Sequence, residues 1–447
     1  MKIYKTKSKI NFHLIAKFTK DNNVAFGKVT EDASRWEATM YLGDKLDLTI
    51  NKLAKVINNF FIGANREYEI HVNSFITKNI DEEQIMKLFI EQDILTSGKI
   101  FSKKSITKKK KQNHILVSKN YTIENFKETI LLSNQMLAIR FFQDMPANLC
   151  TTDYLTNEFR KLFSKSNKIK TKILNKADLK KLGMNLILSV NAGSSQDTKV
   201  IVAEYNNNSS SKKKIVLVGK GIIFDTGGYD LKRGKNILGM KYDMSGAAIA
   251  GYILDTVDKL DLKTNVSIII PITDNLVDST ATLPGAIINS MSGKSVEITN
   301  TDAEGRLILA DSITYASKIM GGSLLIDIST LTGSVVYALG NLYTGVWSTN
   351  DKNWNLLEQA SQKSNEKIWR MPLDEEYIEN VSKNKLADTS SCSTTEYSDC
   401  NIAASWLNSF ADKKDYIHID IAGTADLKEK GQSPMLKTVV EFIKKYK

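Results

Sequence analysis

The spacing of hydrophobic residues divides the chain into an N-terminal part with short, mixed patterns and a longer C-terminal part with continuous apolar runs. In the first part, β-rich runs alternate with helical patterns. Such alternation is typical of an α/β domain, which we expect over residues 1–120. The predicted strands are 11–18, 67–75 and 114–117, and the predicted helices are 48–61 and 82–95.

A long amphipathic stretch follows, and it predicts a helix that links two domains. Apolar side chains recur in helical register over 122–142. The helix is expected to end near Met145, because the residue before Pro146 disfavours helical backbone. We therefore assign residues 121–146 to a linker helix, which a polar loop at 99–112 precedes.

The C-terminal part has the pattern of a sheet that is covered on both faces. Its strands are β-branched, nearly uninterrupted apolar runs, as expected where neither face of a strand meets water. We predict an α/β fold in which this larger domain, 147–447, has a central, mostly parallel sheet flanked by helices. The predicted strands are 215–218, 266–270, 324–328 and 418–421, and the predicted helices are 246–257, 307–319, 353–364 and 437–445.

The composition is that of an ordinary globular protein. With 447 residues, 42% hydrophobic and 25% charged, the chain is long enough for two domains. No apolar run reaches the roughly 18 residues that a bilayer span requires, and no apolar signal core follows the N-terminal lysines. Three scattered cysteines do not make a disulfide framework. These features predict a cytoplasmic protein that does not enter a membrane.

The net charge of +11 raises the alternative of a nucleic-acid-binding protein. The densest basic run is at 108–111, and a solvated loop explains it better than a phosphate-binding patch. Nucleic-acid binding is therefore an alternative that we do not favour. The four histidines are scattered along the chain, so a metal site must be built mainly from oxygen ligands.

The stretch ITNTDAEGRL, at 298–307, places two carboxylates and an arginine where a predicted strand ends and a helix begins. Thr301 and Glu304 fit a capping box at the start of that helix. A cap does not account for Asp302 or Arg306. The stretch therefore either caps a helix or belongs to a site, and the rest of the chain must decide.

More carboxylates follow other elements of the predicted sheet. Asp225 follows the strand at 215–218 in a segment, GKGIIFDTGG, that lacks the glycine spacing of nucleotide-binding loops. Asp243 opens a helix of small residues. Together with Asp302 and Glu304, these groups are expected to meet at the carboxyl ends of strands, where they would repel one another without cations. The oxygen-rich group predicts a hydrolase site for two divalent metal ions.

Five segments, in the same order, resemble the cytosolic leucyl aminopeptidase family of dinuclear metallopeptidases: LVGKGIIFDTGG, MKYDMSGAA, SGKSVEITNTDAEGRL, STLTG and HIDIAGTA. The octapeptide NTDAEGRL is the signature of that family. The resemblance runs from about Pro146 to the C-terminus. It is faint before that point, so the N-terminal domain is assigned by position alone.

The resemblance implies a metal centre that five side chains hold. Lys220 and Asp243 match ligands of the tightly held ion, and Asp302 matches a ligand of the more exchangeable one. Asp225 and Glu304 match carboxylates that bridge both ions. A lysine amine must be neutral to bind a metal, and nearby cations can lower its pKa sufficiently. The implied cofactors are two divalent ions per subunit, Mn²⁺ or Zn²⁺.

The resemblance also implies catalytic and substrate-binding roles. Lys232 matches a catalytic lysine whose ammonium polarises the scissile carbonyl. Arg306 matches an arginine that holds a bicarbonate ion, which acts as the general base, and the start of a helix suits such an anion. Six further positions match residues of the substrate pocket: Met240, Asn300, Thr330, Leu331, Gly333 and Ala422.

The activity implied is that of a leucyl aminopeptidase, a hydrolase that releases N-terminal, preferably large aliphatic, amino acids from peptides. The family further implies a homohexamer in the cytoplasm. Two alternatives stay open: the same fold with an additional DNA-binding or regulatory role, and a catalytically inactive scaffold. The scaffold is disfavoured, because every position that matches a ligand or a catalytic residue is intact.

Three segments depart from the family pattern: 275–286, 390–401 with its two cysteines, and 430–434. None of them removes a residue that matches a metal ligand. We expect the departures to affect the shape of the pocket and the packing of subunits, and not the reaction.

Overall fold

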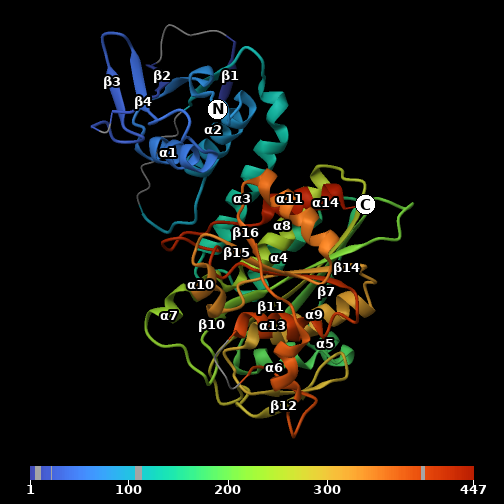
Figure 1. The fold of residues 1–447 in the computed structure, drawn as a ribbon. Helices are drawn as coiled ribbons and strands as arrows, with labels where there is room; N and C mark the ends of the chain where they lie inside the picture. The colour runs from blue at the N-terminus through green and yellow to red at the C-terminus, as the bar shows by residue number, and fades with distance from the viewer. Residues whose placement is uncertain (6–11, 22, 106–112, 394–397, 447) are drawn as a thin grey trace. The chain divides into compact units, whose positions relative to one another are not determined.

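The computed structural model contains two compact units, Met1–Ala138 and Ile139–Lys447 (Figure 1). The division falls inside helix α3 (Lys127–Asp144), within the segment that the sequence predicts as a linker. The lysine run at 108–111, for which a solvated loop is predicted, lies outside the described residues. The structure describes residues 1–5, 12–21, 23–105, 113–393 and 398–446.

The first unit is built on a six-stranded sheet with the strand order β1-β6-β5-β2-β4-β3. Neighbouring strands are parallel except for β3, which pairs antiparallel with β4 at one edge. The strands are β1 (Lys2–Tyr4), β2 (Phe12–Lys17), β3 (Val29–Asp32), β4 (Glu37–Tyr41), β5 (Tyr68–His71) and β6 (Ile115–Val117).

One face of this sheet packs against helices α1 (Ile50–Gly63) and α2 (Glu82–Ser97), which lie close to their predicted positions. Leu14 of β2 and Ile70 of β5 are fully buried in the core that the helices share with the sheet. Side chains alternate along a strand, so the residues that flank these two point to the opposite face. The short 3-10 helix η2 (Ile123–Phe126) then leads into α3.

The strand predicted at 67–75 is shorter than expected. It ends at His71, and the 3-10 helix η1 (Val72–Phe75) follows. The hydroxyl of Ser74 donates to the carbonyl of His71 (2.7 Å) and accepts from the N–H of Ala16 (2.8 Å). The Ser74 hydroxyl thus bonds to two backbone groups that a longer strand would pair. The apolar pattern of the segment gives no sign of this interaction.

The second unit is built on a nine-stranded mixed sheet with the order β16-β15-β18-β14-β9-β11-β8-β7, with β10 also paired to β11. The central strands, from β18 to β11, are parallel, as predicted, and antiparallel pairs lie toward both edges. The strands are β7 (Ile169–Leu174), β8 (Lys199–Asn206), β9 (Ile215–Gly219), β10 (Gly221–Asp225), β11 (Asn265–Asn275), β14 (Leu324–Ser329), β15 (Thr344–Ser348), β16 (Ile368–Arg370) and β18 (Asp415–Asp420).

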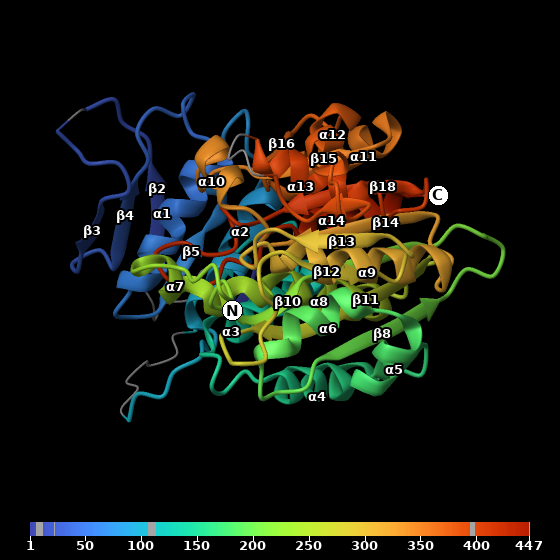
Figure 2. The same ribbon diagram turned by 90° about the horizontal axis from the view of Figure 1, so that it is seen from below.

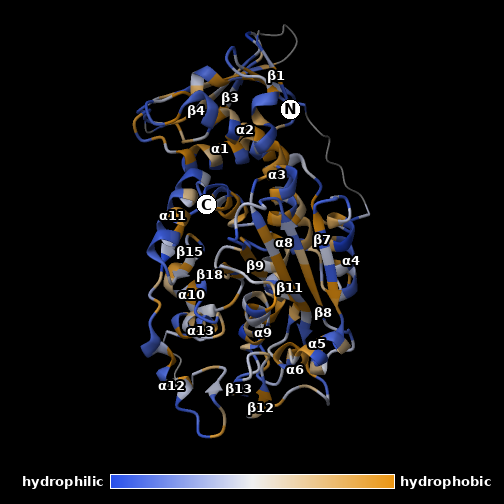
Figure 3. Cartoon of the chain, turned by 90° about the vertical axis from the view of Figure 1, so that its right-hand side faces the viewer, coloured by the Kyte–Doolittle hydropathy of each residue, from blue (hydrophilic) through white to orange (hydrophobic). Residues whose placement is uncertain are grey.

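Helices cover both faces of this sheet, which explains the continuous apolar runs of its central strands (Figures 1 and 3). One face carries α4 (Thr152–Phe163), α8 (Ser245–Lys259), α11 (Asp351–Ser364) and α14 (Leu436–Lys445). The other face carries α6 (Asn185–Val190), α9 (Glu304–Lys318) and α13 (Asp399–Asn408). Shorter helices are α5 (Lys176–Leu182), η3 (Asn191–Gly193), α7 (Lys235–Leu238), η4 (Gly239–Met244), α10 (Gly333–Leu339), η5 (Glu375–Ile378) and α12 (Glu379–Ser382).

A small three-stranded sheet, of β12 (Ala286–Asn289), β13 (Ser295–Ile298) and β17 (Thr389–Ser390), lies next to α6 and α9 (Figure 2). Asp302 and Glu304 follow β13 of this small sheet, whereas Asp225 ends a strand of the large sheet. They reach the other carboxylates because α9 packs on the large sheet. Within the described ranges, every helix is too short or too polar to cross a bilayer.

Candidate active site

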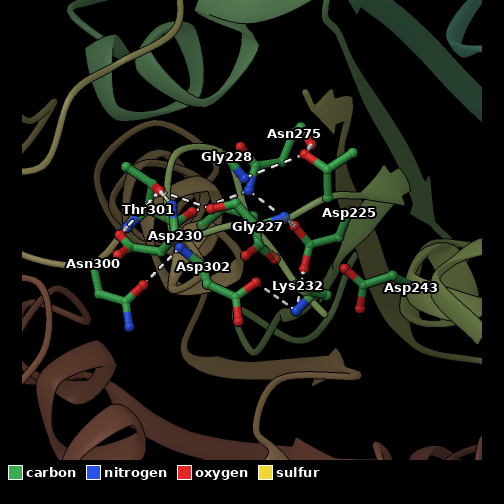
Figure 4. A network of polar contacts seen from close by, with 12 residues as sticks. Asp225, Gly227, Gly228, Asp230, Lys232, Asp243, Asn275, Asn300, Thr301 and Asp302 are labelled. Carbon is green, nitrogen blue, oxygen red and sulfur yellow. Dashed lines mark hydrogen bonds and ion pairs between the residues drawn. The ribbon is translucent and has the colours of Figure 1, made fainter. Parts of the chain in front are cut away.

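Asp225 ends strand β10 at the carboxyl edge of the large sheet. Its Oδ1 accepts hydrogen bonds from the N–H of Gly227 and from Nδ2 of Asn275, both at 2.9 Å (Figure 4). Gly227 has a φ of +89°, and a β-carbon there would stand 2.8 Å from Oδ1 of Asp302. The turn therefore needs glycine both for its backbone conformation and for the approach of this second carboxylate.

Lys232 lies between two of the carboxylates that the sequence singles out (Figure 4). Its Nζ is 2.8 Å from Oδ2 of Asp225 and 2.5 Å from Oδ1 of Asp302. The backbone N–H of Lys232 donates to the carbonyl of Thr226 (2.9 Å), which closes the loop that carries it. The lysine enters the cluster from a loop, so it can act on a group bound beside the carboxylates.

Lys220 is buried between β9 and β10, and it enters the cluster from the sheet. Its Nζ lies 2.9 Å from Oδ2 of Asp243 and 2.9 Å from Oε1 of Glu304. It also donates to the carbonyl of Thr330 at 2.8 Å, and the hydroxyl of Thr330 donates to Oδ1 of Asp243 at 2.6 Å. This one ammonium therefore contacts two carboxylates and a backbone carbonyl.

Glu304 is the first residue of α9, but the predicted capping box is absent. No side chain caps the helix, whose N-cap residue is Ala303. The hydroxyl of Thr301 instead donates to the carbonyl of Gly227 (2.7 Å) and accepts from the N–H of Asp230 (2.9 Å). Thr301 thus ties the turn before α9 to the loop after β10. Thr301 is therefore not the cap of α9, and its contacts favour the alternative in which the stretch ITNTDAEGRL belongs to a site.

The carboxylates of the cluster perturb one another strongly. Burial and the charge of Asp225 raise the pKa of Glu304 to about 8, and the same two causes raise the pKa of Asp302 to about 6. Burial opposes the charge on Lys220, but the carboxylates of Asp243 and Glu304 outweigh it and raise the pKa of this lysine. Perturbations of this kind are typical of catalytic and metal-binding sites.

The donor atoms fit divalent cations. One carboxylate oxygen each from Asp225, Asp302 and Glu304 lie within 4.8 Å of one another. Oε2 of Glu304 is buried and has no hydrogen-bond donor among the described residues. A buried carboxylate oxygen without a donor is costly, and a cation would satisfy it. With Asp243 and Lys220 close by, the group supplies the hard ligands that such ions prefer.

Arg306 follows Glu304 by two residues in α9 and is buried. Its Nη2 lies 2.9 and 3.1 Å from the two carboxylate oxygens of Asp399, and its Nη1 donates to the carbonyl of Ser391 at 3.2 Å. Nε has no acceptor within the described part of the chain. Asp399 and Ser391 belong to the divergent segment 390–401, so this segment reaches the residue for which an anion is expected.

Four of the residues predicted for the substrate pocket lie shortly after strands of the large sheet. Thr330 and Leu331 follow β14, Ala422 follows β18, and Gly333 opens α10. One buried residue, Asp420, accepts hydrogen bonds from the N–H groups of both Leu331 and Ala422, each at 3.0 Å. Its side chain therefore holds the two loops together.

The other two pocket candidates lie beside the carboxylates. Met240 is half-buried in η4, three residues before Asp243. Oδ1 of Asn300 accepts a hydrogen bond from the N–H of Asp302 at 2.8 Å, so this side chain positions that carboxylate (Figure 4).

Three residues at the site are absent from the sequence prediction. Asn275 orients Asp225, Asp420 joins the two pocket loops, and Asp399 pairs with Arg306. Asn275 and Asp420 end the observed strands β11 and β18, but Asn275 lies beyond the predicted strand 266–270 and Asp420 lies within the predicted strand 418–421. Asp399 carries no signal in the sequence, since the fold alone brings it to α9.

Comparison with known proteins agrees with this geometry. Residues 137–441 match the model of the cytosol aminopeptidase family, catalytic domain. A probable cytosol aminopeptidase of Metamycoplasma salivarium is 38% identical over 423 residues, which are 93% of this chain and 81% of that protein. One of Mycoplasma pneumoniae is 33% identical over 409 residues, 91% of both proteins.

A solved structure shares the fold. The bottromycin maturation enzyme BotP in complex with Mn superposes with a TM-score of 0.85 at 23% identity, covering 97% of this chain and 98% of that one. The folds of both units are therefore present in this solved structure. The family match and the close relatives together identify the chain as a member of the cytosol aminopeptidase family and as a peptidase of the hydrolase class.

Proposed function

We propose that this protein is a metal-dependent aminopeptidase of leucyl type, which removes N-terminal amino acids from peptides. The observation that carries the proposal is the convergence of Asp225, Asp302 and Glu304 within 4.8 Å, with a buried oxygen of Glu304 that lacks a donor. Asp243 and Lys220 complete the set of five ligands. Two divalent ions bound there would supply a hydroxide nucleophile and Lewis acids for the peptide carbonyl.

We propose Mn²⁺ or Zn²⁺ as the ions, in line with the Mn that BotP binds on the same fold. Lys220 would join the set as a neutral amine, giving up its proton to solvent and its ion pairs with Asp243 and Glu304. Asn275 keeps Asp225 oriented throughout, since its Nδ2 bonds only one of the two carboxylate oxygens.

Lys232 is proposed as the group that polarises the scissile carbonyl. Its ammonium is held between Asp225 and Asp302, and the same carboxylates keep it charged. Preorganised positive charge of this kind stabilises a developing oxyanion without further rearrangement.

A bicarbonate ion is proposed at Arg306, where it would serve as the general base. The unpartnered Nε and the nearby start of α9 favour an anion. Asp399 already accepts from the same guanidinium, so the anion has to share or displace this carboxylate.

Substrate selection is proposed to rest on six pocket residues and on the substrate's own α-amine. A free α-amine that contacts the metal centre restricts cleavage to the first peptide bond. Large aliphatic side chains are expected to suit the apolar surface of Met240 and Leu331. The pocket residues are Met240, Asn300, Thr330, Leu331, Gly333 and Ala422.

We further propose a cytoplasmic homohexamer of closed symmetry. The relatives from Metamycoplasma salivarium and Mycoplasma pneumoniae are named probable cytosol aminopeptidases, which supports the cytoplasmic location. Sedimentation equilibrium at micromolar concentration should give the mass of six chains, and a fully active monomer would contradict the hexamer. An additional DNA-binding or regulatory role is not proposed, because a solvated loop explains the densest lysine run better than a phosphate-binding patch does.

One assay tests the activity. The protein is stripped with a chelator, re-supplied with Mn²⁺, Zn²⁺, Co²⁺ or Mg²⁺ in turn, and mixed with leucine anilide and with a leucyl peptide. Hydrolysis should vanish after chelation and return with at least Mn²⁺ or Zn²⁺. An N-acetylated leucyl peptide serves as the matched control and should be almost untouched. Comparable rates on the free and the acetylated peptide would overturn the role of the α-amine.

A further inference from the structure

A second group of side chains that could hold a metal ion lies in the first unit, on the face of its sheet opposite α1 and α2. Strands β2 and β5 are parallel neighbours, and their register places His13 beside Glu69. His71 follows Glu69 by two residues, so it points to the same face. The pattern of two adjacent strands thus brings two imidazoles and one carboxylate together, although 55 or more residues separate His13 from the other two.

The distances among these groups match those between ligands of one ion. Nε2 of His71 is 3.1 Å from Nδ1 of His13, and Nδ1 of His13 is 3.4 Å from Oε2 of Glu69. Each residue offers a ligand atom within 4.8 Å of the other two. Tetrahedral zinc with bonds near 2.05 Å separates its ligands by about 3.3 Å. Two of the three separations are therefore already those of a zinc site.

Burial favours a tightly held ion at this place. The Glu69 side chain is 1% exposed and that of His13 is 19% exposed, so the carboxylate is desolvated while one imidazole borders on solvent. A neighbouring cation stabilises a desolvated carboxylate more than an exposed one, because the electrostatic attraction is stronger at a low dielectric constant. The two imidazole nitrogens at 3.1 Å must share one proton in a hydrogen bond, whereas a cation accepts a lone pair from both.

We propose that His13, Glu69 and His71 form a binding site for one divalent transition-metal ion, Zn²⁺ in the first instance, with solvent as a fourth ligand. Imidazole ligands favour zinc over Mg²⁺ and Ca²⁺, which prefer oxygen. The ion would cross-link β2 to β5 through their side chains. The site uses only residues of the first unit, and it does not depend on the proposed peptidase mechanism.

The first test is the zinc content of the full-length protein after saturation and dialysis. The double variant His13→Ala/His71→Ala should bind one zinc fewer per chain than the wild type. The matched control is His114→Asn, which removes an imidazole from the same unit but outside the group. It should bind as much zinc as the wild type. Equal zinc content in the double variant and the wild type would overturn the proposal.

The second test works on the wild type and so does not depend on how the double variant folds. The carboxylate cluster of the second unit contains no imidazole within the described residues. The two other imidazoles, of His114 and His418, are buried and hydrogen-bonded. Pulsed electron paramagnetic resonance of bound Cu²⁺ should therefore show imidazole nitrogens only if the proposed site is filled. Protein in which Asp225→Asn and Glu304→Gln weaken the catalytic centre should keep this signal. Its absence from both proteins would refute the site, whatever the outcome for peptidase activity.

Discussion

The end of the Lys220 side chain lies directly against the backbone of Gly305. A β-carbon on Gly305 would stand 2.6 Å from Cε and 2.7 Å from Nζ of this lysine. Gly305 is the second residue of α9, so the helix approaches the lysine closely enough for Glu304 to reach it. Glycine is therefore needed at position 305, because any side chain there would displace Lys220, a proposed metal ligand.

Gly305→Ala should lower kcat/KM on a leucyl peptide by roughly 10²-fold, because the new methyl group displaces the lysine by about an ångström. Helix propensity alone would predict a gain in stability of about 1 kcal/mol from the same change. Gly63→Ala is the control, since a β-carbon at Gly63 meets nothing within 4 Å. Full activity in Gly305→Ala would show that the position of Lys220 is not critical.

Lys232→Ala should leave two ions bound while turnover falls by about 10²–10³, or 2.7–4 kcal/mol, as for the loss of an oxyanion stabiliser. Metal retention is expected because the variant removes a positive charge from between Asp225 and Asp302. Metal analysis after dialysis, run beside steady-state kinetics, measures both quantities. Loss of metal would instead make Lys232 part of the binding set.

Glu304→Ala should lose metal, because the remaining carboxylates then lack the side chain that is proposed to bridge both ions. A residue that served only to cap α9 would cost about 1 kcal/mol of stability and leave the metal content unchanged. Metal analysis and a melting curve on the same sample separate these results. Two ions retained in the variant would remove Glu304 from the proposed ligands.

Asp399→Asn should lower the bicarbonate concentration that half-saturates activity. The carboxylate of Asp399 now accepts from Nη2 of Arg306, and the neutral amide competes less well with an added anion. The assay is a bicarbonate titration in buffer that has been freed of carbon dioxide. Identical titrations for the variant and the wild type would mean that the anion does not bind at Arg306.

His114 should make the first unit sensitive to mild acid. Burial lowers its pKa to about 4, and its Nδ1 accepts the N–H of Tyr68, which requires the neutral ring. The unfolded chain binds a proton near pH 6.5, so stability is lost as pH falls below that value toward 4. The loss reaches about 2 kcal/mol by pH 5. His114→Asn keeps an acceptor but does not titrate.

Melting curves at pH 7.5 and pH 5 check this difference. The wild type should lose more stability between the two pH values than His114→Asn does. An equal loss in both proteins would show that His114 is also able to hold its proton in the folded state.

The parts of the fold that hydrophobic spacing determines could be predicted from the sequence. The core strands β9 and β14 and the helix α8 lie within a few residues of their predicted positions, because burial on both faces leaves a continuous apolar run. The end of β5 could not be predicted in this way. It depends on Ser74, whose hydroxyl pairs with backbone groups on two strands.

Individual site residues could be named from motifs, but their neighbours could not. The carboxylates Asp225 and Glu304 carry a recognisable pattern, whereas Asp399 reaches Arg306 only through the fold of a divergent segment. The spacing between Thr301 and Glu304 leaves two interpretations open, a helix cap or a part of a site. The spacing fits a cap, yet the hydroxyl of Thr301 donates its hydrogen bond to the backbone carbonyl of Gly227, 74 residues away in the sequence.

The hydrogen bonds of Asp420 have a consequence for how substrate preference can change. They hold the loops after β14 and β18 through backbone N–H groups, at Leu331 and Ala422, and leave the side chains of both positions uninvolved. Under the proposed function, a replacement at either position therefore changes the surface of the pocket without removing the hydrogen bonds that hold the two loops. Related enzymes can then differ in their preference for the N-terminal residue while they keep the same loop connection.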